Sequence, residues 1–146
     1  MKWTMFYNVT DLYSIEIPNS VNLIPPLYLT ECSMVSVSPD NKYYDSRNNC
    51  NAIIATSTNS LIVGSKNTVI PNSVTNIGSQ AFNNCTGLTS ITIPNSVIEI
   101  YGNAFNNCSN LETITSLATT APAIDDSTFR NVKTNGTLTV PSGSSG

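Results

Sequence analysis

Two short stretches of this sequence each recur unchanged after 23 residues. Residues 70–74 read Ile-Pro-Asn-Ser-Val and return at 93–97, and residues 81–85 read Ala-Phe-Asn-Asn-Cys and return at 104–108. A fixed period of about 20 to 50 residues is typical of solenoids, in which each coil buries its apolar face only by stacking on its neighbours. The spacing therefore predicts stacked coils of 23 residues.

The repeat unit itself predicts how each coil is built. Residues 91–93, Ile-Thr-Ile, alternate apolar and polar, which is the pattern of a half-buried strand. Stacked coils would pair such strands in parallel on one face, about 4.8 Å apart, and Pro94 would end each strand. Residues 79–85 are too short for a stable isolated helix but suit one helical or 3₁₀ turn opposite the sheet. One aromatic side chain per coil would form a stacked, buried spine: Phe6, Phe82, Phe105 and Phe129.

The same register extends over most of the chain, so we expect a single domain at 1–146. Residues 15–18 match 91–94, and residues 138–141 carry the strand motif a last time. Counting in steps of the repeat puts Val35 at the position of Leu88, after which an insertion of about 38–66 interrupts the period. Two β-branched runs at 51–56 and 60–63 flank residues 57–59 and predict a hairpin that projects from the solenoid or lies along its flank. Residues 142–146 are expected to be a flexible Gly/Ser tail.

Composition excludes several classes of function. Charged residues make up 10% of the chain against roughly 25% in ordinary soluble domains, and the net charge of -3 includes no basic cluster for nucleic acid. The chain has no histidine, which removes Ser-His and Cys-His nucleophiles, and its carboxylates, including the adjacent pair Asp125 and Asp126, are dispersed. We therefore expect no enzyme activity, no cofactor and no metal. No apolar run is long enough to cross a membrane.

The N-terminal residues lack the apolar segment of a secretory signal. Either the protein is not exported on its own, or the sequence is a mature or truncated segment.

The four cysteines are interpreted by their place in the repeat. Cys32, Cys85 and Cys108 share one position, where stacked coils point the same way into the core, so we expect buried free thiols aligned in a row. Cys50 lies outside the repeat, and its role is left open.

The pattern I-x-I-P-x-S-V-x-x-I-G-x-x-A-F-x-x-C-x-x-L resembles the BspA-like leucine-rich repeat family of bacterial surface proteins. It stands here at 91–97 with 104–108, and again at 68–88, and residues 44–54 also resemble a segment that recurs in that family. The resemblance implies a leucine-rich repeat solenoid at the cell surface or secreted, with adhesion or binding of host proteins as its function. It implies no catalytic residues.

Two surfaces are candidates for binding a host or matrix protein or a glycan. One is the inserted segment, because Tyr and Arg are enriched at binding hot spots: Tyr43, Tyr44, Asp45 and Arg47. The alternative is that these residues only anchor the hairpin, with Arg47 pairing Asp45 or a backbone carbonyl. The other surface is the outward row of strand residues: Ser14, Glu16, Val69, Ser90, Thr92, Thr113, Thr115 and Thr139. End-to-end or edge self-association and a purely structural spacer role are further alternatives.

Overall fold

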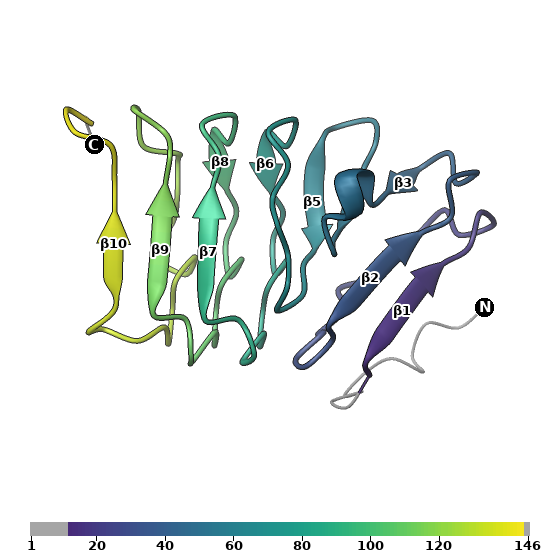
Figure 1. The fold of residues 1–146 in the computed structure, drawn as a ribbon, viewed down its shortest axis with the longest axis horizontal. Coiled ribbons are helices and arrows are strands. Elements are labelled where there is room, and N and C mark those ends of the chain that lie inside the picture. The colour runs from purple at the N-terminus through teal and green to yellow at the C-terminus, as the bar shows by residue number, and fades with distance from the viewer. Residues whose placement is uncertain (1–11, 145–146) are drawn as a thin grey trace.

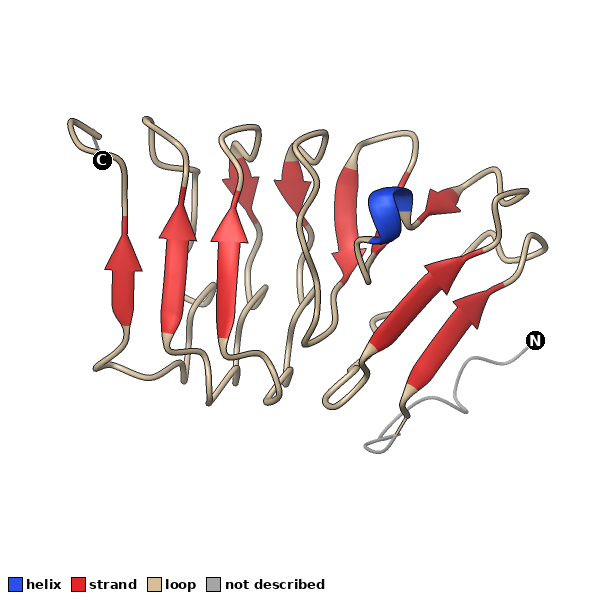
Figure 2. Ribbon diagram, in the orientation of Figure 1, coloured by secondary structure: helices blue, strands red, loops and turns tan. Residues whose placement is uncertain are grey.

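The computed structural model describes residues 12–144, and within them the chain winds as a β-solenoid (Figures 1 and 2). Its front wall carries two parallel sheets. One pairs β1 (Ser14–Ile17) with β2 (Met34–Val37), and the other has the order β10 (Thr137–Thr139), β9 (Thr113–Ser116), β7 (Ser90–Ile93). The predicted leucine-rich repeat architecture is therefore confirmed, with a front strand in every described coil except the one between β2 and β7.

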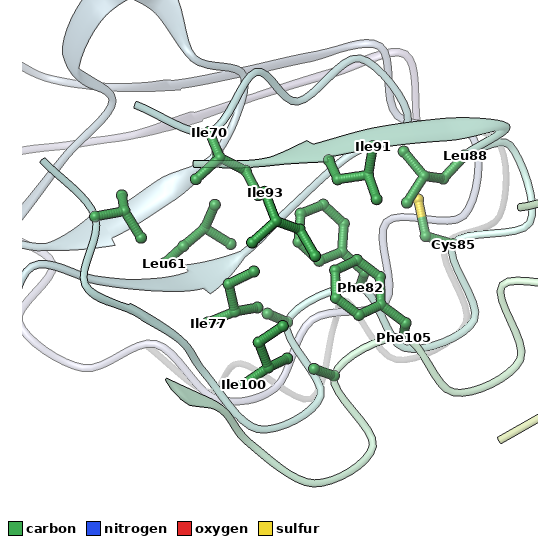
Figure 3. Close-up of a cluster of buried hydrophobic side chains, with 14 of the residues drawn as sticks. Leu61, Ile70, Ile77, Phe82, Cys85, Leu88, Ile91, Ile93, Ile100 and Phe105 are labelled. Carbon is green, nitrogen blue, oxygen red and sulfur yellow. The ribbon is translucent and has the colours of Figure 1, made fainter. Parts of the chain in front are cut away.

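A second wall of strands runs behind the first. It has the order β3 (Tyr44–Asp45), β4 (Ile53–Ala55), β5 (Ser60–Val63), β6 (Asn76–Ile77), β8 (Glu99–Ile100), and a single bridge from Glu99 to Ala123 extends it. Pairing is antiparallel from β3 to β5 and parallel from β5 to β8. The buried side chains of the two walls meet in the core between them, as Figure 3 shows for Ile91 and Ile93 opposite Ile77 and Ile100.

The turns before each front strand are hydrogen-bonded turns rather than helices. In the described residues the single helical element is the 3₁₀ turn η2 (Arg47–Asn49), which lies in the insertion. Gln80, Asn84 and Asn107 have φ values of 63°, 60° and 60°, and such left-handed residues interrupt any helix. The asparagine amides stack instead: Asn107 Nδ2 donates to Asn84 Oδ1 at 3.0 Å, and Asn131 Nδ2 donates to Asn107 Oδ1 at 2.7 Å.

The aromatic spine is confirmed for its three described members. The rings of Phe82 and Phe105 stack with centroids 4.9 Å apart, and those of Phe105 and Phe129 with centroids 5.1 Å apart. Gly64 closes the other face of Phe82, since a Cβ atom on Gly64 would lie 2.0 Å from that ring. The expected member Phe6 lies outside the described residues.

The four cysteines are free and buried, as predicted for the three in the repeat. Burial raises the pKa of Cys85 to about 12, and the neighbouring thiols of Cys108 and Cys32 contribute to that shift. Burial likewise raises the pKa of Cys108 to about 12. Cys50 is buried in the insertion, within hydrogen-bonding distance of Ser46 Oγ at 3.8 Å.

Two expectations about the N-terminal half are wrong. Val35 pairs with Ile15 in the β1–β2 ladder, so it takes the place of Ile91 rather than that of Leu88, and this coil is shorter than 23 residues. The hairpin β4–β5 neither projects from the solenoid nor lies along its flank. Ile54 and Leu61 belong to the main core, while Ile53 and Val63 belong to a second core beneath β1 and β2, so the hairpin is buried between the two.

Candidate binding surfaces

Arg47 holds the inserted segment together. Its Nε and Nη2 atoms donate to the two carboxylate oxygens of Asp45 at 2.8 and 2.6 Å, and Nη1 donates to Asn59 Oδ1 at 2.9 Å and Ser73 Oγ at 3.2 Å. The hydrogen bond that Arg47 donates to Asp45 is the largest cause of the raised Arg47 pKa. A guanidinium engaged on both edges has few donors left for a partner. The geometry therefore supports the anchor interpretation of Asp45 and Arg47.

The two tyrosines of the insertion differ in exposure. Tyr44 is half-buried, packs against the second core and donates its hydroxyl to the Asn22 carbonyl at 3.3 Å. Tyr43 is 52% exposed and is held through its backbone: its N–H donates to Asn41 Oδ1 at 2.8 Å, and its C=O accepts from the Thr56 N–H at 3.0 Å. Of the four residues predicted in the insertion, Tyr43 is the one that presents most of its side chain to solvent.

The predicted row of strand residues is divided between two sheets. Ser14 and Glu16 are exposed on β1, and five more are exposed or half-exposed on the β7–β9–β10 sheet: Ser90, Thr92, Thr113, Thr115 and Thr139. The remaining member, Val69, is exposed but lies in no strand. The structure adds Met34 and Ser36 on β2 and Thr137 on β10. The β2 residues were missed because the sequence register gave β2 no strand.

A break in the front wall separates these two groups. The coil between β2 and β7 should contribute a strand at 68–70, but its hydrogen bonds go elsewhere. Thr68, at the position of Ile91, accepts a hydrogen bond from the Ser65 N–H at 2.8 Å and donates its hydroxyl to the Asn51 carbonyl at 2.8 Å. The Val69 N–H donates to the Cys50 carbonyl at 3.0 Å. These bonds hold residues 65–69 against the insertion instead of against β7.

The break leaves one edge of β7 open. The Thr113 N–H donates to the Thr89 carbonyl at 3.2 Å, and the Leu117 N–H donates to the Ile93 carbonyl at 2.9 Å. Because alternate residues of a parallel strand bond to the same neighbour, Thr89, just before β7, and Ile91 and Ile93 within it are the residues that bond to β9. The backbone N–H and C=O groups of Ser90 and Thr92 therefore point away from β9. Within residues 12–144 they have no hydrogen-bond partner.

A hollow of about 380 Å³ lies beside this open edge. We call it the β7-edge groove, and it is lined on one side by β7 and on the other by Thr68, Val69, Ile70 and Asn72. Sequence reasoning did not find it, although one signal was present: Thr68 stands where the next two coils have Ile91 and Ile114.

A larger and mostly apolar hollow, of about 490 Å³, lies at the C-terminal end of the solenoid. Its lining includes the half-buried Phe129 and the exposed Ile124, Leu138 and Val140. This end presents the last ring of the spine and the outer edge of β10, the features on which a further coil would stack.

Among residues 12–144, the titratable groups form no arrangement suited to acid–base chemistry. The pKa of Asp125 is lowered by hydrogen bonds from the Ser127 hydroxyl and N–H, and the pKa of Glu112 is lowered by Lys133. A general acid needs the opposite shift. In the described part of the chain no group of three His, Cys, Asp or Glu residues could hold a metal ion, and no helix is long and apolar enough to cross a membrane.

Comparison with known proteins agrees with this architecture. The family described as BspA type leucine-rich repeat region (six copies) matches residues 2–63 and 53–145, so the chain belongs to the BspA-type leucine-rich repeat family. No curated protein matches it.

Two crystal structures of bacterial proteins are similar. A leucine rich cell surface protein from Faecalibacterium prausnitzii A2-165 is 26% identical with a TM-score of 0.60, and the match covers 82% of this chain and 39% of that one. A leucine-rich repeat protein from Eubacterium ventriosum is 21% identical with a TM-score of 0.49, over 82% of this chain and 41% of that one. The chain thus spans about two fifths of the proteins that it matches.

Proposed function

We propose that this chain is a non-catalytic binding module of a bacterial surface leucine-rich repeat protein. The observation that carries the proposal is the β7–β9–β10 sheet, which presents short hydroxyl side chains on a rigid backbone: Ser90, Thr92, Thr113, Thr115, Thr137 and Thr139. The stacked rings of Phe82, Phe105 and Phe129 pack the core beneath this sheet, so a partner can bind to a rigid surface without rearrangement of the fold. Localisation at the cell surface is proposed with it, since one similar structure is of a protein named a cell surface protein.

The partner that suits this face is uncharged or weakly charged. Ionised groups are absent from the outward positions of these three strands, in a chain whose charged residues number only 15. A host or matrix protein, or a glycan, can meet such a face through hydrogen bonds to hydroxyl groups. Nucleic acid would need a basic surface that this chain lacks.

A binding screen with two variants tests the proposal. Immobilised matrix proteins and glycans are probed with the wild type, with Thr92→Lys/Thr115→Lys on the sheet, and with Tyr43→Ala in the insertion. Arg47 is left intact because its removal would loosen the hairpin as well as change the surface. The proposal expects a partner whose binding falls at least tenfold in the lysine variant and stays within twofold in Tyr43→Ala, at unchanged Tm.

Two results would contradict it. Loss in Tyr43→Ala alone would move the site to the insertion, and the absence of any partner above background would favour a structural spacer.

A further inference from the structure

We propose that the β7-edge groove binds an uncharged, extended peptide segment of a partner protein as an added β-strand. The proposal rests on the proposed binding function and gives it a site and a partner chemistry. An open sheet edge is a template for another extended backbone, and main-chain hydrogen bonds then supply affinity while side-chain pockets supply specificity.

The backbone pattern of β7 selects an extended chain over other ligands. Ser90 and Thr92 each present one N–H and one C=O to the groove, and residues two apart on a strand repeat every ~6.6 Å. An extended peptide has the same repeat of donors and acceptors along one edge. A sugar or a small polar molecule does not reproduce that spacing over both residues.

The side chains around the groove restrict the peptide further. Val69 is 71% exposed on one side, and Leu117 is 49% exposed at the end near Pro94. None of the residues that line the groove carries a charge. A charged peptide side chain would lose hydration there without gaining an ion pair, so the groove suits apolar and hydroxyl side chains.

The edge of β2 that faces the same gap shows what a protected edge looks like. Asn51 Oδ1 accepts a hydrogen bond from the Val35 N–H at 3.4 Å, Ser46 Oγ donates to the Val35 carbonyl at 3.0 Å, and Asn67 Nδ2 donates to the Ser33 carbonyl at 3.2 Å. At Ser33 and Val35, side chains therefore occupy positions that an added strand would need on β2. On β7 no described side chain does so, and this contrast favours β7 as the docking edge.

The probe is a peptide with blocked ends and the sequence of residues 113–118, Thr-Ile-Thr-Ser-Leu-Ala, which is uncharged and pairs with the other edge of β7 in the fold. Two versions are N-methylated on alternate residues, one at the first and third positions and one at the second and fourth. Binding to the full chain is measured by NMR titration, and amide exchange is followed in the complex.

We expect saturable binding, at least tenfold weaker binding of one methylated peptide and near-normal binding of the other, and new protection at the Ser90 and Thr92 amides. Thr92→Pro removes one groove donor at a position where the N–H takes no part in the β9 ladder, and should weaken binding at least tenfold. Its matched control, Thr92→Val, keeps the Thr92 N–H and changes only the exposed side chain, so it should bind at least threefold more tightly than Thr92→Pro. If Thr92→Pro does not fold, the methylated peptides still test the proposal on an unaltered protein.

Several outcomes would overturn the proposal. These are no binding, equal binding of both methylated peptides, or protection at Leu138 on the β10 edge instead of at β7. If the peptide fails while a screened partner still depends on Thr92 and Thr115, the binding function survives and only the strand-addition site is lost.

Discussion

Replacing Phe105 by alanine should be among the most destabilising single changes in this chain. The ring is fully buried and stacks on both faces, at 4.9 Å on Phe82 and 5.1 Å on Phe129. Emptying a buried Phe site costs about 3–5 kcal/mol, and each stacked pair contributes about 0.5–1.5 kcal/mol beyond burial. We therefore expect a loss of about 4–5 kcal/mol in the free energy of unfolding, at the upper end of that range.

The measurement is urea denaturation with linear extrapolation, with two comparisons. Phe129→Ala should cost roughly half as much, because that ring is half-buried and has one stacking neighbour among the described rings. Tyr101→Ala, which removes a 42% exposed ring, should cost less than ~1 kcal/mol. A loss below ~1 kcal/mol for Phe105→Ala, or equal losses for Phe105 and Phe129, would refute the spine as a source of stability.

Three further changes test other parts of the stack. Asn107→Gly and Asn107→Ala both remove the amide ladder, but glycine adopts φ 60° without strain whereas the Cβ of alanine disfavours it. The alanine variant should therefore be less stable than the glycine variant by about 1 kcal/mol in thermal unfolding; equal Tm values would contradict this. Gly64→Ala should cost about 1–3 kcal/mol, because its Cβ would lie 2.0 Å from the Phe82 ring; an unchanged urea midpoint would mean that the two do not pack. In the folded protein the pKa of the Cys85 and Cys108 thiols is raised from 9.0 to about 12, so between these pH values they stay protonated while the thiols of the unfolded chain ionise. Their contribution to the free energy of unfolding is therefore complete below pH 9 and is lost as the pH rises from 9 to 12. The urea midpoint should fall less over that range in a variant with alanine at both cysteines, and an equal fall in both proteins would contradict the assignment.

The clean repeats made the solenoid predictable from sequence. Positions such as Ile91, Phe105 and Cys108 recur at the same spacing because each coil must place the same atoms against its neighbour. The repeat therefore specified the strands and the spine of these coils without knowledge of the rest of the chain.

The N-terminal register was not predictable in the same way. Turn length between strands can change without cost to the ladder, and the coil from Ser14 to Met34 is shorter than the clean repeats. Counting by a fixed period therefore assigned Val35 to the position of Leu88, whereas the structure places it at that of Ile91. The burial of the β4–β5 hairpin was signalled by the adjacent pair Ile53 and Ile54, since a strand that is apolar on both faces is covered on both faces.

The candidate site depended on hydrogen bonds between distant segments. The anchoring of Arg47 by Asp45 was one of two open interpretations, and its contacts with Asn59 and Ser73 could not be predicted from local pattern. The β7-edge groove exists because Thr68 bonds to Asn51, which lies in the insertion, and a repeat pattern does not report such a partner.

Amide hydrogen exchange along β7 in the free protein tests the account most directly. If the front wall is broken beside β7, exchange should alternate: slow at Ile91 and Ile93, whose N–H groups bond to β9, and fast at Ser90 and Thr92, whose N–H groups face the groove. Uniformly slow exchange from Ser90 to Ile93 would show that residues 68–70 complete the sheet. In that case the groove, and the strand-addition site proposed in it, would not exist.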